Sequence, residues 1–320
     1  MKKNKIKDTG LEVTELSFGT SSLGSMPDTY GYEVPEDRAQ KTLNRFFQGP
    51  VNMLDTSRNY AMGESEKRIG KAIKENGGWP NGFLLSTKLD RNMDTLVLDK
   101  NRVRESLEES LKTLNVDSVD ILFLHDPEYA KDITDITKKD GAMDELFKIK
   151  NEGLAKAAGV AMGKVDIMFP LLKDWDFDVI INHNRYTLIN REANEMYDYA
   201  SSKNIAIFNA APYAGGVLAK GPDNFKKVTY QDATEEKLAP AREFEKVCKK
   251  HNVELGAAAL QFSLRDNRIT STICGVTSVE SIEKNLAWAN AEISGEFWDE
   301  VLKLPFSSND PESDRVFTAG

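Results

Sequence analysis

Short apolar runs alternate with amphipathic stretches along most of this 320-residue chain. Apolar runs of about four to eight residues bounded by turn formers are typical of buried strands, and apolar positions recurring every three or four residues are typical of helices. The pattern predicts strands at residues 16–20, 51–55, 83–88, 119–124, 154–160, 177–182, 205–209 and 270–274. It predicts helices at residues 36–48, 64–75, 101–114, 143–151, 165–173, 191–202, 235–250, 254–264 and 279–289. Asn101 is a candidate N-cap for the third of these helices.

The order of these elements favours a closed (β/α)8 barrel, a TIM barrel of the α/β class. An open doubly wound sheet is the alternative, but it needs GxGxxG after the first strand, where this chain has FGTSSLGS. Residues 5–13 predict a short N-terminal hairpin turned at Thr9 and Gly10. Because no linker rich in Pro, Gly or Ser divides the chain, residues 1–320 are predicted to form one domain. The polar tail, residues 305–320, is expected to fold over the barrel mouth.

The composition limits the classes of binding partner and the cellular compartment that we expect for the protein. A net charge of −9 argues against nucleic acid and anionic membrane surfaces, which both need clustered Lys and Arg. No apolar run approaches the ~20 residues of a membrane helix, and the charged N-terminus lacks the apolar segment of a signal peptide. The distant Cys248 and Cys274 favour reduced thiols in a cytoplasm, and three isolated histidines predict no metal site. The protein is therefore predicted to be cytoplasmic and metal-free, as a monomer or a homo-oligomer.

Four polar residues lie at or near the ends of three successive predicted strands. Asp55 ends VNMLD, Lys88 ends FLLSTK and His125 ends VDILFLH, while Tyr60 follows Asp55 by five residues. The carboxyl ends of parallel strands converge on the face of a barrel where chemistry is done. A tyrosine with a pKa of about 10 is a weak acid–base group at neutral pH, and a neighbouring ammonium lowers that pKa. Lys88 would supply the ammonium, Asp55 would keep it charged, and His125 would orient the substrate oxygen for hydride exchange with a nicotinamide.

Each residue also has an ordinary structural interpretation. A lone Asp often forms a turn, a Tyr often packs with its hydroxyl in water, a Lys is mostly solvated and a His is often a satisfied core group. The joint placement of three complementary groups at successive strand ends favours catalysis. A glycosidase would need two catalytic carboxylates, and only Asp55 stands out, with Asp126 a weaker second.

The segments LDTSRNYAMGESEKRIGKAI (54–73), STKLD (86–90) and FLHD (123–126) carry these four residues in order. In this pattern the chain resembles the aldo-keto reductase superfamily along essentially its whole length. The resemblance implies a barrel with a nicotinamide cofactor extended across its mouth. It also implies that Tyr60 is the acid–base, that Lys88 and Asp55 tune it, and that His125 orients the substrate.

The segment TICGVTSVESIEKNLAWA (272–289) is similar to the adenosine-phosphate site of that superfamily. Where NADP-selective relatives carry basic residues, this chain has Gly275 and Ser281, so NAD is favoured over NADP. The acidic Glu280 and Glu283 favour the same choice. His183 stands where relatives usually have Gln. The resemblance assigns cofactor contacts to residues near strand ends, namely Thr20, His183, Ala211, Gly216, Gly275, Thr277, Ser281 and Asn285.

The RYTLI segment (185–189) and the unusual cofactor positions resemble the branch of the superfamily that oxidises aldoses at carbon one. Its members act on D-threo-aldoses or L-fucose, D-arabinose, L-galactose and pyridoxal. The branch implies oxidation of a cyclic hemiacetal hydroxyl to a lactone, with Tyr60 accepting the hydroxyl proton. The polar residues expected near a sugar are Arg58, Asn59, Asn184, Arg185, Tyr30 and Tyr32.

Two alternatives stay open. Within enzymes, the chain could be an NADPH-dependent reductase of small aldehydes or ketones. Outside them, it could be a nucleotide-sensing binding module, as the potassium-channel β-subunits of the superfamily illustrate.

Overall fold

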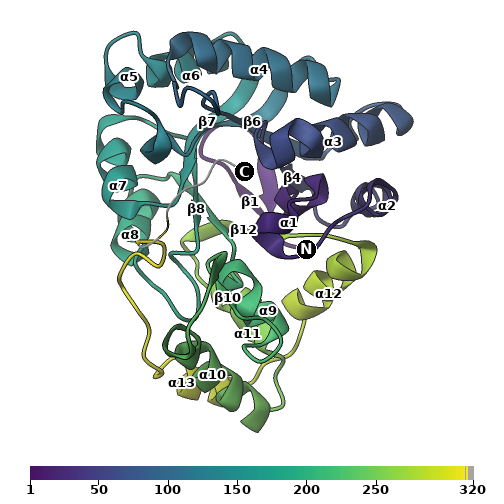
Figure 1. The fold of residues 1–320 in the computed structure, drawn as a ribbon, viewed down its shortest axis with the longest axis vertical. Helices are drawn as coiled ribbons and strands as arrows, with labels where there is room; N and C mark the ends of the chain where they lie inside the picture. Colours follow the sequence, from purple (N-terminus) through teal and green to yellow (C-terminus); the bar gives the residue numbers. More distant parts are fainter. Residues whose placement is uncertain (314, 316–320) are drawn as a thin grey trace.

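The computed structural model describes residues 1–313 and 315. Parallel strands close into a barrel in the order β12-β3-β4-β5-β6-β7-β8-β9, with helices outside it (Figure 1). The barrel strands are β3 (Leu16–Gly19), β4 (Met53–Asp55), β5 (Leu84–Leu89), β6 (Val119–His125), β7 (Ala155–Met162), β8 (Val179–His183), β9 (Ala206–Ala210) and β12 (Ile269–Gly275). The predicted TIM barrel is confirmed.

The helices of the predicted pattern are present with small shifts at their ends. They are α2 (Glu36–Phe46), α3 (Glu64–Glu75), α4 (Lys100–Leu114), α6 (Ala142–Asn151), α7 (Val165–Asp174), α8 (Asn194–Ser202), α10 (Glu235–Lys250), α11 (Leu255–Leu264) and α12 (Val279–Ala289). Further short elements were not predicted, because an element of only one or two turns is too short to show a clear apolar period. These are α1 (Pro27–Tyr30), α5 (Thr134–Thr137), α9 (Val217–Lys220), α13 (Gly295–Val301), β10 (Lys227–Val228), β11 (Gln231–Asp232), and the 3₁₀ turns η1 (Ser21–Gly24), η2 (Tyr60–Gly63), η3 (Pro127–Tyr129) and η4 (Ala214–Gly216).

The N-cap predicted for α4 was wrong. Asp99, two residues before Asn101, is the N-cap. Its carboxylate accepts hydrogen bonds from the backbone N–H groups of Asn101 at 3.0 Å and Arg102 at 2.9 Å. An Asp side chain satisfies the orphan amides of the first turn as well as Asn does, and Asp99 has the extended backbone that a cap requires.

The predicted N-terminal hairpin is present and closes one end of the barrel. Strands β1 (Lys3–Lys5) and β2 (Glu12–Thr14) pair antiparallel, and the Thr9 hydroxyl donates to the carbonyl oxygen of Ile6 at 2.6 Å in the turn. Ile6 and Val13 are buried in the same apolar cluster as residues of the barrel interior. The hairpin thus fills the end opposite the carboxyl ends of the strands.

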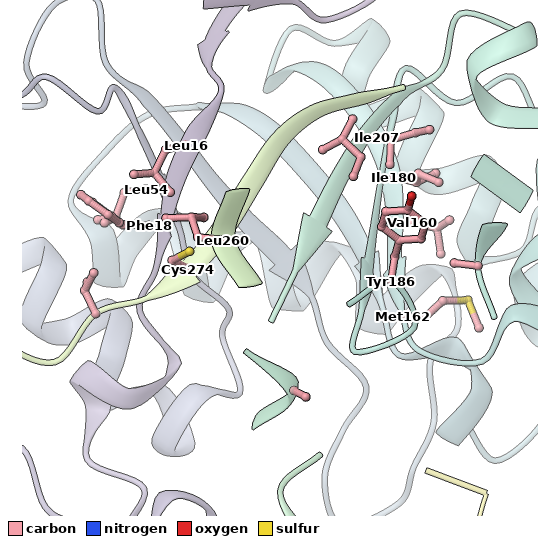
Figure 2. Packing of buried hydrophobic residues seen from close by; sticks show 14 of the residues in the cluster. Leu16, Phe18, Leu54, Val160, Met162, Ile180, Tyr186, Ile207, Leu260 and Cys274 are labelled. Carbon is pink, nitrogen blue, oxygen red and sulfur yellow. The ribbon is translucent and has the colours of Figure 1, made fainter. Parts of the chain in front are cut away.

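Successive strand residues face alternately into the barrel and out toward the helices. Figure 2 shows outward residues in two groups, with Leu16, Phe18, Leu54 and Cys274 in one and Val160, Met162, Ile180 and Ile207 in the other. Inward residues form a second cluster that includes Met53, Leu84, Ile121, Phe123, Val179, Ile181 and Phe208. Asp55, Lys88 and His125 keep the inward parity of their strands, so they face the barrel mouth at its carboxyl end.

The described part of the tail lies against the mouth, as expected. Asn190 forms an isolated bridge with Ser307, and its amide donates to the carbonyl oxygen of Asn309 at 2.8 Å. The rest of the predicted tail, residues 314 and 316–320, lies outside the described residues. Within residues 1–313 and 315, no helix is long and apolar enough to cross a membrane.

Candidate active site

Asp55 and Lys88 form a buried ion pair between neighbouring strands. The Lys88 ammonium donates to Oδ2 of Asp55 at 2.8 Å and to the carbonyl oxygen of Thr56 at 2.6 Å. The Ser86 hydroxyl donates to the other carboxylate oxygen of Asp55 at 2.9 Å. The side chains of the pair are only 5% and 2% exposed. A buried charge needs a partner of this kind, and each residue of the pair supplies one to the other.

Tyr60 lies at the start of a tight turn that points its ring toward both neighbours. Lys88 Nζ is 4.8 Å from the centroid of the Tyr60 ring, and the His125 ring meets it edge-on with centroids 5.9 Å apart. The next three residues are left-handed, and the third is Gly63, with φ 93°. A Cβ at Gly63 would lie 2.3 Å from the Arg58 guanidinium, so this turn requires glycine.

His125 meets a buried carboxylate that the sequence analysis did not assign to the site. Its Nδ1 lies 2.5 Å from Oδ1 of Asp90, which directly follows β5 and is fully buried. The second oxygen of Asp90 accepts from the Ser57 hydroxyl at 2.6 Å and from the backbone N–H of Asn59 at 3.1 Å. A single carboxylate therefore holds both the imidazole and the loop that leads to Tyr60.

The pKa values of Tyr60 and His125, the two candidate proton-transfer groups, are raised for different reasons. Burial raises the pKa of Tyr60 well above its ordinary value, and the Asp55 carboxylate adds to the rise. The lowering of this pKa expected from Lys88 is therefore not found, because burial and the nearby carboxylates disfavour the phenolate. Burial lowers the pKa of His125, but Asp126 and Asp90 outweigh it and hold the pKa above its usual range. Tyr60 is thus a neutral phenol at rest.

Asp90 could have been found from strand parity alone. It lies two residues after Lys88, so it continues the inward-facing series of β5 beyond the end of the strand. A carboxylate at that position faces the end of β6, where the sequence already indicated His125. The signal was present in STKLD, but a single Asp beside a loop was not distinguished from a turn former.

The predicted cofactor residues after β12 gather at the first turn of α12. Ser278 and Ser281 form a reciprocal capping box, and the Ser281 hydroxyl also accepts from the backbone N–H of Thr277 at 2.9 Å. Asn285 is already engaged, since it accepts from the Tyr213 hydroxyl and donates to the carbonyl oxygen of Ser281 at 2.7 Å. Gly275 ends β12 with open space where a Cβ would be.

A cavity of about 470 Å³ opens beside this turn, between α2 and α12. Its lining residues are Asp37, Arg38, Lys41, Ser278, Val279 and Glu280. Arg38, Lys41 and the Ser278 hydroxyl could donate to a phosphate group, whereas Asp37 and Glu280 would repel it. Arg38 and Lys41 could not be assigned from the sequence, because they come from a helix far from the matched segment. Each has a carboxylate nearby, with Lys41 3.5 Å from Asp37.

The remaining cofactor candidates lie at three other strand ends. Thr20 follows β3, fully buried, and its hydroxyl donates to the carbonyl oxygen of Asp55 at 3.0 Å. Ala211 follows β9 with φ 55°, and Gly216 has φ 123° in the loop after it. His183 ends β8, with Nδ1 3.4 Å from Oε2 of Glu312. All the predicted site residues therefore surround the carboxyl end of the barrel.

Four of the residues expected to contact a sugar have partners within the protein. Arg185 is 1% exposed and pairs with Asp310 at 2.6 Å and with Glu312 in the tail. Arg58 donates to Glu109 on α4 at 2.9 Å. Tyr30 and Tyr32 pack together, with ring centroids 6.0 Å apart.

Comparisons with known proteins agree with this geometry. The model described as "Aldo/keto reductase family" matches residues 15–304. L-galactose dehydrogenase of Arabidopsis thaliana is 31% identical over 284 residues, covering 88% of this chain and 85% of that protein. D-threo-aldose 1-dehydrogenase of a Pseudomonas species is 27% identical over 320 residues, covering 92% and 94%. A solved aldo-keto reductase from Bacillus halodurans, in its holo form, has a TM-score of 0.77 at 22% identity, covering 99% of this chain and 100% of that one.

Proposed function

This chain belongs to the aldo/keto reductase family, and from that premise we propose that it oxidises an aldose at carbon one to the lactone, with NAD as the favoured cofactor. The observation that carries the proposal is the convergence of Tyr60, Lys88 and His125 at one point of the barrel mouth. The named activities of the Arabidopsis and Pseudomonas relatives support an aldose as the substrate class.

In alcohol oxidation, each residue of the site would have its own role. A bound nicotinamide would take up the hydride that leaves carbon one. Tyr60 accepts the hydroxyl proton, and the Lys88–Asp55 pair keeps a cation 4.8 Å from its ring. Because burial raises the pKa of Tyr60, the phenol has to release its own proton to solvent before it can accept the proton of the substrate hydroxyl. The positive charge of an oxidised nicotinamide bound at the mouth would favour that release.

One observation favours a second candidate, an NADPH-dependent reductase of small aldehydes or ketones. A phenol that stays protonated is ready to donate a proton to a carbonyl oxygen, which is the direction of reduction. The same four residues would serve both directions of the reaction.

The experiment is a substrate panel. Purified protein is mixed with NAD or NADP and with L-fucose, D-arabinose, L-galactose, D-glucose or pyridoxal, and reduced nicotinamide is followed by absorbance. A signal with NAD and an aldose supports the proposal. Silence across the panel, with NADPH consumed by simple aldehydes, replaces it by the reductase. Silence in both directions, with nucleotide still bound, favours a nucleotide-sensing module.

The cofactor preference rests on the first turn of α12. Ser281 uses its hydroxyl in the capping box, and Glu280 lines the adjoining cavity. Ser281→Arg should raise the ratio of NADP to NAD efficiency about tenfold, because a guanidinium would pair with the 2′-phosphate. Measured kcat/KM for both cofactors checks this result. Ser281→Ala is the matched control, since it also removes the Ser281 hydroxyl from the capping box but adds no charge. An unchanged ratio in Ser281→Arg would mean that the 2′-position lies elsewhere.

A further inference from the structure

Asp126, the residue after His125, turns its carboxylate back toward the mouth of the barrel. Successive residues of a strand point to opposite faces, so the residue after inward-facing His125 would ordinarily face the helices. Asp126 instead has a left-handed backbone with φ 44°, and its N–H donates to the carbonyl oxygen of Ala161 at 2.9 Å. Its Oδ1 lies 3.6 Å from Nε2 of His125, and the side chain is 20% exposed. The left-handed turn therefore places a carboxylate beside the imidazole.

The carboxylate of Asp126 does not serve the turn in which it lies. An Asp in a turn usually accepts a hydrogen bond from a backbone N–H close by in the chain. Asp126 begins η3, yet its side chain does not cap that turn. Within residues 1–313 and 315, Nε2 of His125 is its neighbour, at a distance too long for a hydrogen bond. The carboxylate is therefore available to a ligand at the mouth.

The reacting oxygen of a substrate would lie next to this carboxylate. Nδ1 of His125 lies 2.5 Å from Oδ1 of Asp90, so Nε2 is the nitrogen that can donate to the reacting oxygen. The Tyr60 ring lies against the same imidazole, with centroids 5.9 Å apart. An oxygen held between Tyr60 and Nε2 is therefore within a few ångströms of Asp126. Burial has the largest influence on the pKa of both rings, but the Asp126 carboxylate also raises the pKa of Tyr60 and that of His125.

We propose that Asp126 is a specificity-determining residue, which accepts a hydrogen bond from a hydroxyl on the carbon next to the reacting carbon. For an aldose oxidised at carbon one, this group is the hydroxyl of carbon two. The hydrogen of the reacting hydroxyl goes to Tyr60, whereas the neighbouring hydroxyl keeps its hydrogen and donates it to Asp126. The inference rests on the proposed function and deepens it, because it adds a second hydroxyl to what the substrate must carry.

A carboxylate in this position discriminates against substrates that lack the second hydroxyl. An ionised carboxylate only accepts hydrogen bonds, so a substrate without a donor displaces its water and leaves it without a partner. Loss of a hydrogen bond to a charged group is expected to lower kcat/KM about 10- to 100-fold. Simple aldehydes and alcohols are therefore expected to be poor substrates.

The test measures kcat/KM for paired substrates. The pairs are an aldose and its 2-deoxy analogue in oxidation, and glycolaldehyde and acetaldehyde in reduction. The wild type should prefer the member that carries the hydroxyl by the factor given above. Asp126→Gly removes the carboxylate, keeps the left-handed backbone and should abolish this preference, while Asp126→Asn should keep part of it. Both members of a pair meet the same altered pKa values of Tyr60 and His125, so the change in the ratio isolates the hydrogen bond.

Glu128→Gln is the matched control. Its carboxylate lies two residues further along the same loop and accepts from the backbone N–H of Gly163 at 2.9 Å, so the wild-type preference should persist. The inference is wrong if Asp126→Gly keeps the preference or if Glu128→Gln loses it.

The two substrate pairs separate this inference from the proposed function. An aldose that is oxidised with the same ratio in wild type and Asp126→Gly would leave the function standing and overturn the inference. A ratio that depends on Asp126 only for glycolaldehyde would replace the function by the reductase and keep the inference. Calorimetric titration of the same pairs onto the protein with NADH measures the preference even without turnover.

Discussion

Tyr60→Phe is expected to lower aldose turnover by about 10²- to 10⁴-fold, the range that a positioned acid–base group contributes. The substitution removes one oxygen and keeps the ring. The ring contacts with the Lys88 ammonium and the His125 edge therefore remain. Because the proposed mechanism gives the phenol the proton-transfer step, and the hydroxyl contributes little to packing, kcat should fall while cofactor affinity stays close to that of the wild type. Steady-state kinetics and cofactor titration by fluorescence measure the two quantities.

The matched control is Tyr199→Phe. Tyr199 lies on α8, where its ring packs against Phe169 outside the barrel. The same loss of one hydroxyl there should leave turnover unchanged. If Tyr60→Phe retained turnover like that of the wild type, the acid–base assignment would be wrong and another group would have to take the proton.

Arg185→Met is expected to reduce the free energy of unfolding by about 3–5 kcal/mol, the range for breaking a buried ion pair by removing one partner. Arg185 and Glu312 both have side chains only 1% exposed, and Asp310 adds a second carboxylate at 2.6 Å. Methionine fills a similar volume but removes the cation that the two carboxylates share, so Asp310 loses this partner and Glu312 keeps Arg315 and His183. Urea unfolding followed by circular dichroism measures the change.

An exposed pair provides the comparison. Lys71 and Glu36 are 49% and 52% exposed, so Lys71→Met should destabilise the protein far less than Arg185→Met does. Burial opposes ionisation of Glu312, but His183, Arg185 and Arg315 together hold its pKa below the ordinary value. A lowered pKa gives stability that is present above the pKa of the unfolded chain and lost as pH falls. The gap between wild type and Arg185→Met should therefore narrow in acid; a gap that widens would contradict the ion-pair explanation.

Much of the barrel could be predicted from the sequence, because the apolar runs of its strands and the three-to-four-residue apolar period of its helices are both clear. Three of the four site residues end an apolar run and take the inward-facing position of its alternation, namely Asp55, Lys88 and His125. The barrel fold then predicts that their side chains converge at its mouth. The direction of the Tyr60 ring could not be predicted in the same way, since it depends on three successive left-handed residues that no periodicity encodes.

Contacts between distant segments were beyond the reach of local patterns. The sequence places Arg185 at the barrel mouth, where we expected it to contact a sugar. In the structure its partner is Glu312, which is 127 residues away along the chain. Arg38 and Lys41 line the cavity beside Ser278 only because α2 packs beside α12. The pKa of Tyr60 likewise depends on burial, and burial is a property of the assembled mouth. Pairings of this kind need coordinates.

The seam between β3 and β12 bears on how the chain folds as it is made. Leu16 pairs with Thr272, and the hydroxyls of Ser17 and Ser271, 254 residues apart, meet at 2.6 Å. The barrel therefore cannot close until β12 has been synthesised. Until then β3 and the newest strand are open edges, which are templates for pairing with another chain. The nascent protein is most exposed to aggregation just before this seam forms, and chaperone dependence should concentrate there.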